Sequence, residues 1–210
     1  MVRTATRLPR YQRNVDGLVL PVSVTDQPAL DFCNTRAGWN SAEPREYLVT
    51  YDHLVVWARE ASLIDAEAAA RLRHGVTSEP AAARRVLDRA LALRSAIHTT
   101  CTDPDAAGAW DEVATAAHAA AAVAVLVREA PPGRRWAIPE STGPELPLLE
   151  LGRAAGALLA STDLSAVRSC PGHDCGWLFL DPRRRRRWCT MAVCGNRAKA
   201  RRHAARAKRA

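Results

Sequence analysis

The central part of the chain carries apolar residues at the spacing of one helix face. Leu54, Trp57, Ala58 and Ala61 stand at positions i, i+3, i+4 and i+7. This spacing predicts a helix over residues 50–61 with these side chains facing inward. The same periodicity, together with capping residues and prolines in first turns, predicts the other helices. They span residues 26–34, 65–72, 78–97, 103–119 and 148–159, with Asp26 and Asp65 expected to cap the first two. The residues of the last helix that are expected to face inward are Leu148, Leu151, Ala155, Leu158 and Leu159.

Stretches typical of strands are short and few. Residues 18–24 predict an edge strand, because Pro21 has no N–H to donate within a central ladder. Residues 121–128 and 135–139 predict a hairpin across the Pro-Pro-Gly sequence at 131–133. The alternative is that the alanine-rich run before the hairpin extends the preceding helix. The pattern therefore predicts an α+β fold, with a mainly helical N-terminal domain that contains a small antiparallel sheet.

Four cysteines near the C-terminus form two pairs with the same C-x4-C spacing. They are Cys170, Cys175, Cys189 and Cys194. Two such knuckles complete a tetrahedron of thiolates around one zinc ion, and four cysteine ligands leave no coordination position open for catalysis. The segment has too few apolar residues to fold without a staple, which also favours a structural metal. Two disulfides are the alternative, but nothing marks the chain as secreted.

The rest of this segment predicts a small treble-clef-like zinc finger composed of a knuckle, a β-hairpin and a helix. The hairpin tip is expected at the five consecutive arginines, Arg183–Arg187. Asn196 is suited to cap a helix over 197–208. His173 lies between the first two cysteines and is expected to be exposed rather than a ligand. The aromatic residues available to cover the metal are Trp177, Phe179 and Trp188.

Positive charge is concentrated on the finger and its tail. The chain has a net charge of +8. From Arg168 onward, eleven arginines and two lysines face two aspartates, which gives +11. Residues 1–167 carry 17 basic and 20 acidic side chains, which gives −3. A basic block on a mildly acidic protein indicates a polyanionic partner.

The motifs resemble a known family. Cys189-x4-Cys194-Gly-Asn-Arg197, preceded by Gly176-Trp-x-Phe-x-Asp181 and Arg187-Trp188, resembles the CGNR-type zinc finger. More loosely, Asp31-Phe-Cys-Asn34-Thr35 and Leu54-x-x-Trp57-Ala58 resemble the ABATE domain that usually precedes this finger in bacteria. Cys33 departs from the aliphatic residue usual at that position. The resemblance implies a DNA-binding protein of a family described as stress-induced transcription regulators.

The C-terminal cations are the candidates for nucleic-acid binding. A slim helix with two basic stripes can enter a DNA major groove, and an arginine run can add phosphate contacts. The candidates are Arg183, Arg184, Arg185, Arg186, Arg187, Arg197, Lys199, Arg201, Arg202 and Arg206. Alternatively, one or two arginines neutralise a four-thiolate zinc centre, but thirteen cations exceed that need. Double-stranded DNA is favoured over RNA chiefly by the family resemblance.

The N-terminal domain offers two polar candidates for a ligand pocket, Asp31 and Asn34. The more ordinary interpretation is that both side chains cap or pin a turn. The histidines at positions 53, 74, 98 and 118 have neither metal-ligand spacing nor a nucleophile partner. No phosphate loop or hydrolase motif is present, so we expect no catalytic residues and no enzymatic activity.

These patterns divide the chain into three parts. Residues 1–16 are expected to form a flexible basic arm, 17–163 an ABATE-like α+β domain, and 164–210 a CGNR-type zinc finger with a basic C-terminal helix. No apolar run is long enough to cross a bilayer, and the N-terminus lacks the apolar segment of a signal peptide. A cytoplasmic location is therefore expected, where thiols stay reduced and available to metal.

Together the patterns predict a zinc-dependent, DNA-binding transcriptional regulator. Its N-terminal domain is expected to sense a small-molecule or protein effector and to reposition the finger through the connector at 161–169. A homodimer is a candidate assembly, since paired half-sites suit two-fold symmetry. The alternatives are an RNA- or ribosome-associated zinc module and a small-molecule enzyme with a structural finger. The operator, the effector and the sign of the transcriptional effect are left open.

Overall fold

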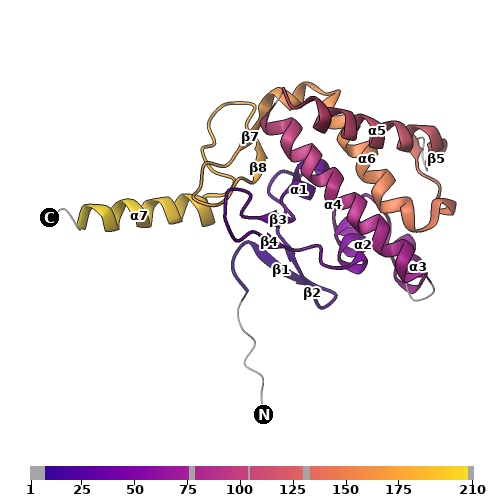
Figure 1. Ribbon diagram of the computed structural model, residues 1–210, viewed down its shortest axis with the longest axis horizontal. Helices are drawn as coiled ribbons and strands as arrows, with labels where there is room; N and C mark the ends of the chain where they lie inside the picture. The colour runs from indigo at the N-terminus through magenta and orange to yellow at the C-terminus, as the bar shows by residue number, and fades with distance from the viewer. Residues whose placement is uncertain (1–7, 76–78, 104, 130–132, 208–210) are drawn as a thin grey trace, which may run out of the picture.

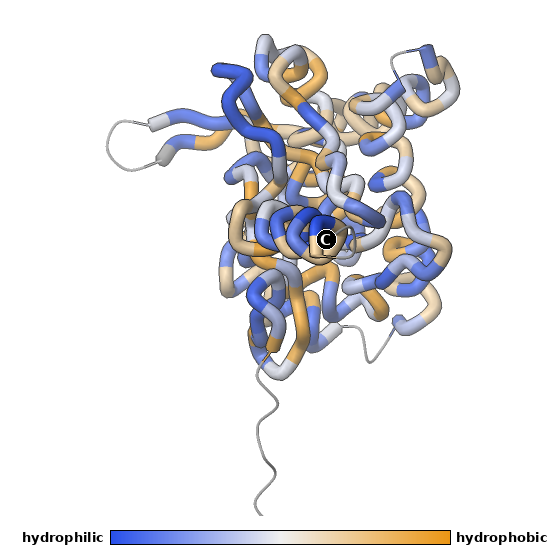
Figure 2. Tube along the Cα trace, turned by 90° about the vertical axis from the view of Figure 1, so that its left-hand side faces the viewer, coloured by the Kyte–Doolittle hydropathy of each residue, from blue (hydrophilic) through white to orange (hydrophobic). Residues whose placement is uncertain are grey.

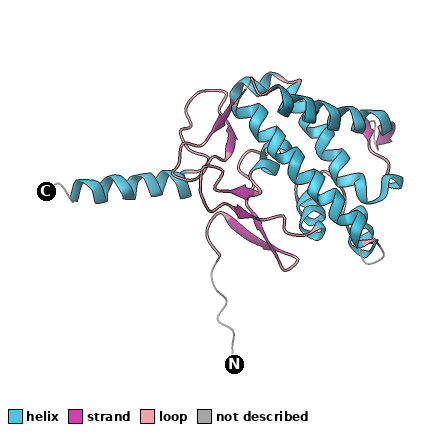
Figure 3. Ribbon diagram, in the orientation of Figure 1, coloured by secondary structure: helices cyan, strands magenta, loops and turns pink. Residues whose placement is uncertain are grey.

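The computed structural model describes residues 8–75, 79–103, 105–129 and 133–207. A bundle of helices forms the body, most of the small sheets lie at one end of it, and one helix projects away from that end (Figures 1 and 3). The helices are α1 (Pro28–Cys33), α2 (Tyr51–Glu60), α3 (Ala66–Gly75), α4 (Pro80–Thr102), α5 (Ala107–Val123), α6 (Leu146–Leu159) and α7 (Asn196–Ala207). The predicted α+β fold is confirmed.

The helical periodicity predicted the positions of these helices well, but it predicted where they begin and end less accurately. Asp65 caps α3 as expected, because its Oδ1 accepts the N–H of Ala68 at 2.7 Å. The cap of α1 is Gln27, whose Oε1 accepts the N–H of Leu30 at 3.1 Å, and not the neighbouring Asp26. The alanine-rich run continues α5 to Val123, as the alternative interpretation allowed.

Four antiparallel strand pairs are found in the described part of the chain. They are β1 (Gln12–Val15) with β2 (Leu18–Pro21), β3 (Arg36–Ala37) with β4 (Arg45–Glu46), β5 (Val125–Glu129) with β6 (Gly133–Ala137), and β7 (Val167–Ser169) with β8 (Leu178–Leu180). The predicted hairpin is therefore present as β5–β6, although its first strand starts at Val125 instead of residue 121. In β1–β2, Pro21 ends the edge strand opposite Gln12.

The prediction of a flexible arm over residues 1–16 is wrong for its last residues. Gln12–Val15 form β1, and the turn that follows places Asp16 and Gly17 at positive φ, 51° and 82°. Such a turn suits the right-handed twist of a two-residue hairpin. Residues 1–7 of the predicted arm lie outside the described residues.

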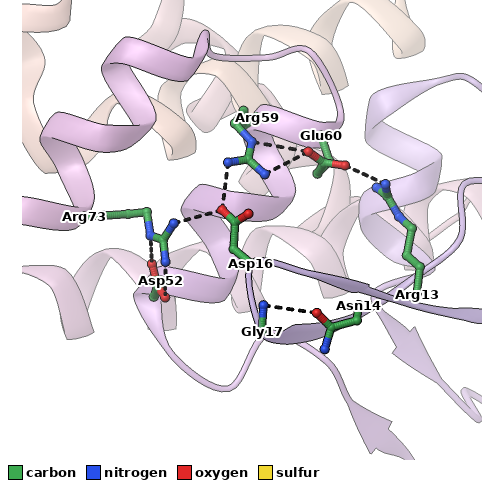
Figure 4. Close-up of polar contacts among 8 residues, drawn as sticks. All are labelled: Arg13, Asn14, Asp16, Gly17, Asp52, Arg59, Glu60 and Arg73. Atoms are coloured by element: carbon green, nitrogen blue, oxygen red, sulfur yellow. Dashed lines mark hydrogen bonds and ion pairs between the residues drawn. The ribbon is translucent and has the colours of Figure 1, made fainter. Parts of the chain in front are cut away.

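A chain of ion pairs holds the β1–β2 hairpin on the helices (Figure 4). The carboxylate of Asp16 accepts hydrogen bonds from Arg59 of α2 at 2.8 Å and from Arg73 of α3 at 2.9 Å. The hydrogen bond from Arg59 is the main reason that the pKa of Asp16 lies below its usual value. Arg13 of β1 pairs with Glu60 in the same way. The hairpin is thus tied to α2 and α3 by several charged contacts.

Helices α5 and α6 approach each other closely through small residues. A Cβ on Gly152 would lie 2.5 Å from the carbonyl oxygen of Ala116, and one on Gly156 would lie 2.8 Å from Cβ of Ala117. Only glycine allows this separation at the two α6 positions. Of the inward residues predicted for α6, Leu159 is half-buried and the other four are buried, including Leu151, which is fully buried in the main core.

Candidate metal centre and basic surface

The four predicted zinc ligands lie together. The sulfur atoms of Cys170, Cys175, Cys189 and Cys194 are all within 4.8 Å of one another. Cys170 follows β7 and Cys175 precedes β8, whereas Cys189 precedes the five-residue π-type turn at Met191–Gly195 and Cys194 lies within it. Two knuckles that are separated in sequence therefore close around one point, as the C-x4-C spacing predicted.

The sulfur spacing fits zinc and excludes disulfides. A tetrahedron with Zn–S bonds of about 2.3 Å has S–S edges of about 3.8 Å. The Cys175–Cys189 and Cys189–Cys194 sulfur pairs are 3.8 and 3.6 Å apart. A disulfide requires about 2.05 Å, and every cysteine of the chain is free in this structure. The four cysteines thus form a site for one structural zinc ion, with no protein position left open for catalysis.

The close packing of the four sulfur atoms shifts the pKa values of the thiols. Hydrogen bonding from the other thiols, chiefly Cys175, lowers the pKa of Cys170. The neighbouring sulfurs, first that of Cys170, raise the pKa of Cys189. Four thiolates cannot share so small a volume without a compensating cation, and zinc binding removes their protons.

Backbone geometry shapes the first knuckle. The N–H of Cys170 donates to the carbonyl of Trp177 at 2.8 Å, and that of Cys175 donates to Gly172 at 2.9 Å. A Cβ on Gly172 would lie 3.0 Å from the Cys194 sulfur, so a larger residue would crowd the metal site. The approach of the second knuckle therefore favours glycine at this position.

Aromatic side chains cover the site, as expected. Trp177 and Phe179 are buried and Trp188 is half-buried, and with the cysteines they make a small second core. This core is separate from the main helical one. Its small size is consistent with a segment that depends on metal to fold.

The finger hairpin is not where the sequence placed it. Strands β7 and β8 pair on either side of the first knuckle, so that the knuckle is the hairpin tip. Arg183–Arg187 instead follow β8 in a turn organised by Asp181, whose carboxylate oxygens accept the N–H groups of Arg185 and Arg186 at 2.8 and 3.1 Å. Asp181 therefore fixes the backbone at the start of the arginine run.

The five arginines of the run differ in what they contact. Arg186 stacks over Phe179 and donates to the carbonyl of Cys189, so that its guanidinium closes the finger. Arg187 lies over Trp188. All five residues are exposed, and the backbone N–H groups of Arg184, Arg185 and Arg186 are bonded to Asp181. Arg186 is therefore a structural residue, whereas Arg183, Arg184 and Arg185 remain available to a partner.

Helix α7 presents its basic residues to solvent. It has no buried residue and extends away from the body, and Figure 2 looks along it and shows it mostly hydrophilic. The prediction that Asn196 caps this helix is wrong. Asn196 has helical backbone angles, and its side-chain amide donates to the carbonyl of Ala192. Thr190 takes this role for the preceding turn by accepting the N–H of Val193 at 3.2 Å. The nucleic-acid candidates Arg197, Lys199, Arg201, Arg202 and Arg206 all lie on this helix.

Asp31 and Asn34, the two candidates for a ligand pocket, have structural contacts. The Asp31 carboxylate accepts hydrogen bonds from the hydroxyl of Ser23 and the N–H groups of Val24 and Thr25 at 2.6–3.2 Å, which pins the chain before α1. Asn34 is 1% exposed, and its amide pairs with the backbone of Leu178 in β8. The ordinary interpretation therefore describes Asp31, whereas Asn34 neither caps nor pins a turn with its side chain but joins the N-terminal domain to the finger.

Two further residues at this junction were not singled out by their sequence context. The N–H of Trp39 donates to the carbonyl of Cys175 at 3.0 Å. Nε2 of His98 lies 2.9 Å from the carbonyl oxygen of Gly176, and its ring stacks on Trp39 with centroids 3.8 Å apart. Burial lowers the pKa of His98. No periodicity or motif marks them, because their partners lie far away along the chain, 78 residues in the case of His98 and Gly176.

The geometry defines a four-thiolate structural zinc finger that is packed onto a helical domain. Residues 166–207 match the family model of the CGNR zinc finger, which confirms the resemblance for that segment, about a fifth of the chain. No curated protein matches the chain. Among the described helices, none combines the length and apolar character that crossing a bilayer requires.

Proposed function

We propose that this protein is a zinc-dependent, DNA-binding transcriptional regulator with an ABATE-like N-terminal domain. The observation that carries the proposal is helix α7, which leaves the zinc centre with no buried residue and with arginine and lysine as its charged side chains. Apart from Arg197, whose guanidinium lies over the ring of Tyr11, the basic side chains of this helix have no described contact with the body of the protein. Its stabilisation is expected to come from a polyanion.

The dimensions and charge of α7 suit a DNA major groove. Twelve residues give a length of about 18 Å, and the alanines between the cations keep the helix slim. Lys199, Arg202 and Arg206 lie at i, i+3 and i+7 on one stripe, and Arg197 and Arg201 lie on another. Two basic stripes can contact phosphates on both walls of a groove about 12 Å wide. The exposed Arg183, Arg184 and Arg185 add three further cations on the same finger.

The N-terminal domain is proposed to receive an effector or a partner, in keeping with its resemblance to ABATE domains. Asn34, Trp39 and His98 are hydrogen-bonded to the backbone of the finger. Effector binding is therefore not expected to rotate the whole finger about its connector. It is expected to act on how α7 is presented or on assembly into a homodimer. The proposal includes no catalytic step and places the protein in the cytoplasm.

Gel-shift titration of duplex DNA at several salt concentrations tests this function. Each phosphate neutralised contributes about 0.9 to the slope of log K against log[salt]. Cys189→Ser should release zinc and abolish binding together, whereas Cys101→Ser, at a thiol outside the metal site, should change neither. Tight salt-independent binding, or structured RNA outcompeting the duplex, would contradict the proposal.

A further inference from the structure

The β5–β6 hairpin presents four exposed side chains on one face. Leu126 pairs with Trp136 across the strands, and Arg128 pairs with Arg134. Because strand side chains alternate between faces, residues two apart lie on the same side, so both pairs share one face of the ribbon. Leu126 is 59% and Trp136 60% exposed, and both arginines are exposed as well.

This face is energetically unfavourable in the free protein. Like charges directly opposite each other on two strands destabilise the pair, and neither Arg128 nor Arg134 has an ion pair or hydrogen bond from its side chain among the described residues. An exposed cross-strand Leu126–Trp136 pair also forgoes the burial that a hydrophobic pair gains. An acidic partner with an apolar side chain would relieve both penalties.

A hollow suited to an apolar side chain lies beside Trp136. It has a volume of about 560 Å³ and is lined mainly by small residues of α5 and α6, among them Ala121, Gly156 and Ala157. Besides Trp136, the one long side chain in the lining is that of Arg153, which pairs with Glu150 of the same helix. Indole on one side and alanine on the other form a place for an aliphatic anchor.

We propose that this surface, made of Leu126, Arg128, Arg134, Trp136 and the adjoining hollow, binds an acidic, extended segment of a partner protein. An aliphatic side chain of the segment lies in the hollow against Trp136. Acidic side chains two residues away lie about 7 Å further along and pair with Arg128 and Arg134. This identifies the chemistry of the partner in the effector role proposed above, without depending on DNA binding.

A protein segment fits this surface better than a nucleic acid or a membrane does. Bases stack on aromatic rings and would leave Leu126 and the alanine-lined hollow without a function. Trp and Arg are the residues that dominate protein interfaces, especially beside a pocket. The ribbon also lies at the opposite end of the molecule from α7 (Figure 1), so that both surfaces can be occupied at once.

The probe is a fluorescein-labelled dodecapeptide of three Leu-Ser-Glu-Ser repeats, which places leucine and glutamate two residues apart in either direction. Fluorescence anisotropy should show that it binds the full chain. The double variant Arg128→Glu and Arg134→Glu should bind it at least tenfold more weakly and should instead bind the same peptide with lysine in place of glutamate. A reversal of charge preference cannot result from misfolding.

A matched pair of variants on α5 tests the hollow. Ala121→Leu fills it and should weaken peptide binding at least tenfold, whereas Ala122→Leu, exposed on the same helix but outside the hollow, should not. All variants should retain duplex DNA binding, which separates this proposal from the proposed function. Absence of peptide binding, equal binding by the charge-reversed variant, or capture of phosphatidylglycerol vesicles or single-stranded oligothymidine by this face in place of the peptide would each overturn it.

Discussion

Asn34 and Leu178, which are 144 residues apart, pair like neighbouring strands. The amide nitrogen of Asn34 donates to the carbonyl of Leu178 at 2.9 Å, and its Oδ1 accepts the Leu178 N–H at 2.9 Å. One side chain therefore satisfies both backbone groups of a fully buried residue in the finger. The pairing fixes β8 on the end of α1 and makes the junction between the domains specific.

Replacing Asn34 by alanine should loosen the finger from the helical domain. It leaves the buried N–H and C=O of Leu178 without partners, at a cost of about 2–5 kcal/mol in the free energy of unfolding. Urea unfolding followed by tryptophan fluorescence measures this. Asn40→Ala, at an exposed position nearby, is the control and should cost less than about 0.5 kcal/mol. Equal stabilities of the two variants would contradict the role assigned to the pairing.

Thiol reactivity should report the metal directly. In the zinc-loaded protein, the four finger cysteines are shielded from a disulfide reagent by coordination. Burial raises the pKa of Cys101 to about 11 and also raises that of Cys33, so these two remain slow at pH 8. A chelator should expose four fast thiols and release one zinc per chain, counted with a colorimetric metal indicator. Four slow thiols after removal of the metal would argue against a shared site.

The arginine run should divide into structural and functional members. Arg186→Ala removes the stacking on Phe179 and the hydrogen bond to the Cys189 carbonyl, so it should lower the zinc affinity and the melting temperature. Arg184→Ala touches only an exposed side chain, and should leave both unchanged while reducing the salt slope of DNA binding by about 1. Zinc competition and salt titrations distinguish them. Identical behaviour of the two variants would contradict a structural role for Arg186 that is distinct from the DNA-contacting role of Arg184.

Protonation of His98 should weaken the junction in mild acid. Burial is the main cause that lowers its pKa below the ordinary 6.5, so the unfolded chain binds the proton more readily than the folded chain does. Stability from neutral His98 is therefore complete above about pH 6.5 and falls as the pH drops below that value. His98→Gln should flatten this part of the curve of unfolding free energy between pH 7 and 5.5. Parallel curves for the two proteins would assign the pH dependence to other groups, such as the zinc thiolates.

The zinc centre was predictable because its signal is local. Two C-x4-C spacings and their flanking aromatic residues specify ligands, coordination and cover without reference to the rest of the chain. The body helices were predictable for the same reason, since Leu54 and Trp57 report a helical face within one segment. Their ends were less so, because α5 could continue or stop at the alanines according to the tertiary context.

What could not be predicted depends on contacts between distant segments. Asp181 looks like a turn residue, but only the folded finger shows that its carboxylate organises the arginines after β8 and so displaces the expected hairpin tip. Asn34 looks like a cap until β8 is brought beside it. The ABATE resemblance includes Asn34, but the contact that Asn34 makes is seen only in the folded junction.

The hydrogen bond of Trp177 limits how this finger can be moved to another protein. Its indole nitrogen donates to the carbonyl of Arg36 at 2.9 Å, so a piece of the zinc core is completed by a residue from the other end of the polypeptide. A finger excised with only its own cysteines would keep the four metal ligands but lose the Arg36 carbonyl that accepts this hydrogen bond. If the proposed DNA binding holds, its sequence preference is therefore better changed by exchanging α7 alone, beyond the last cysteine, than by grafting the whole unit.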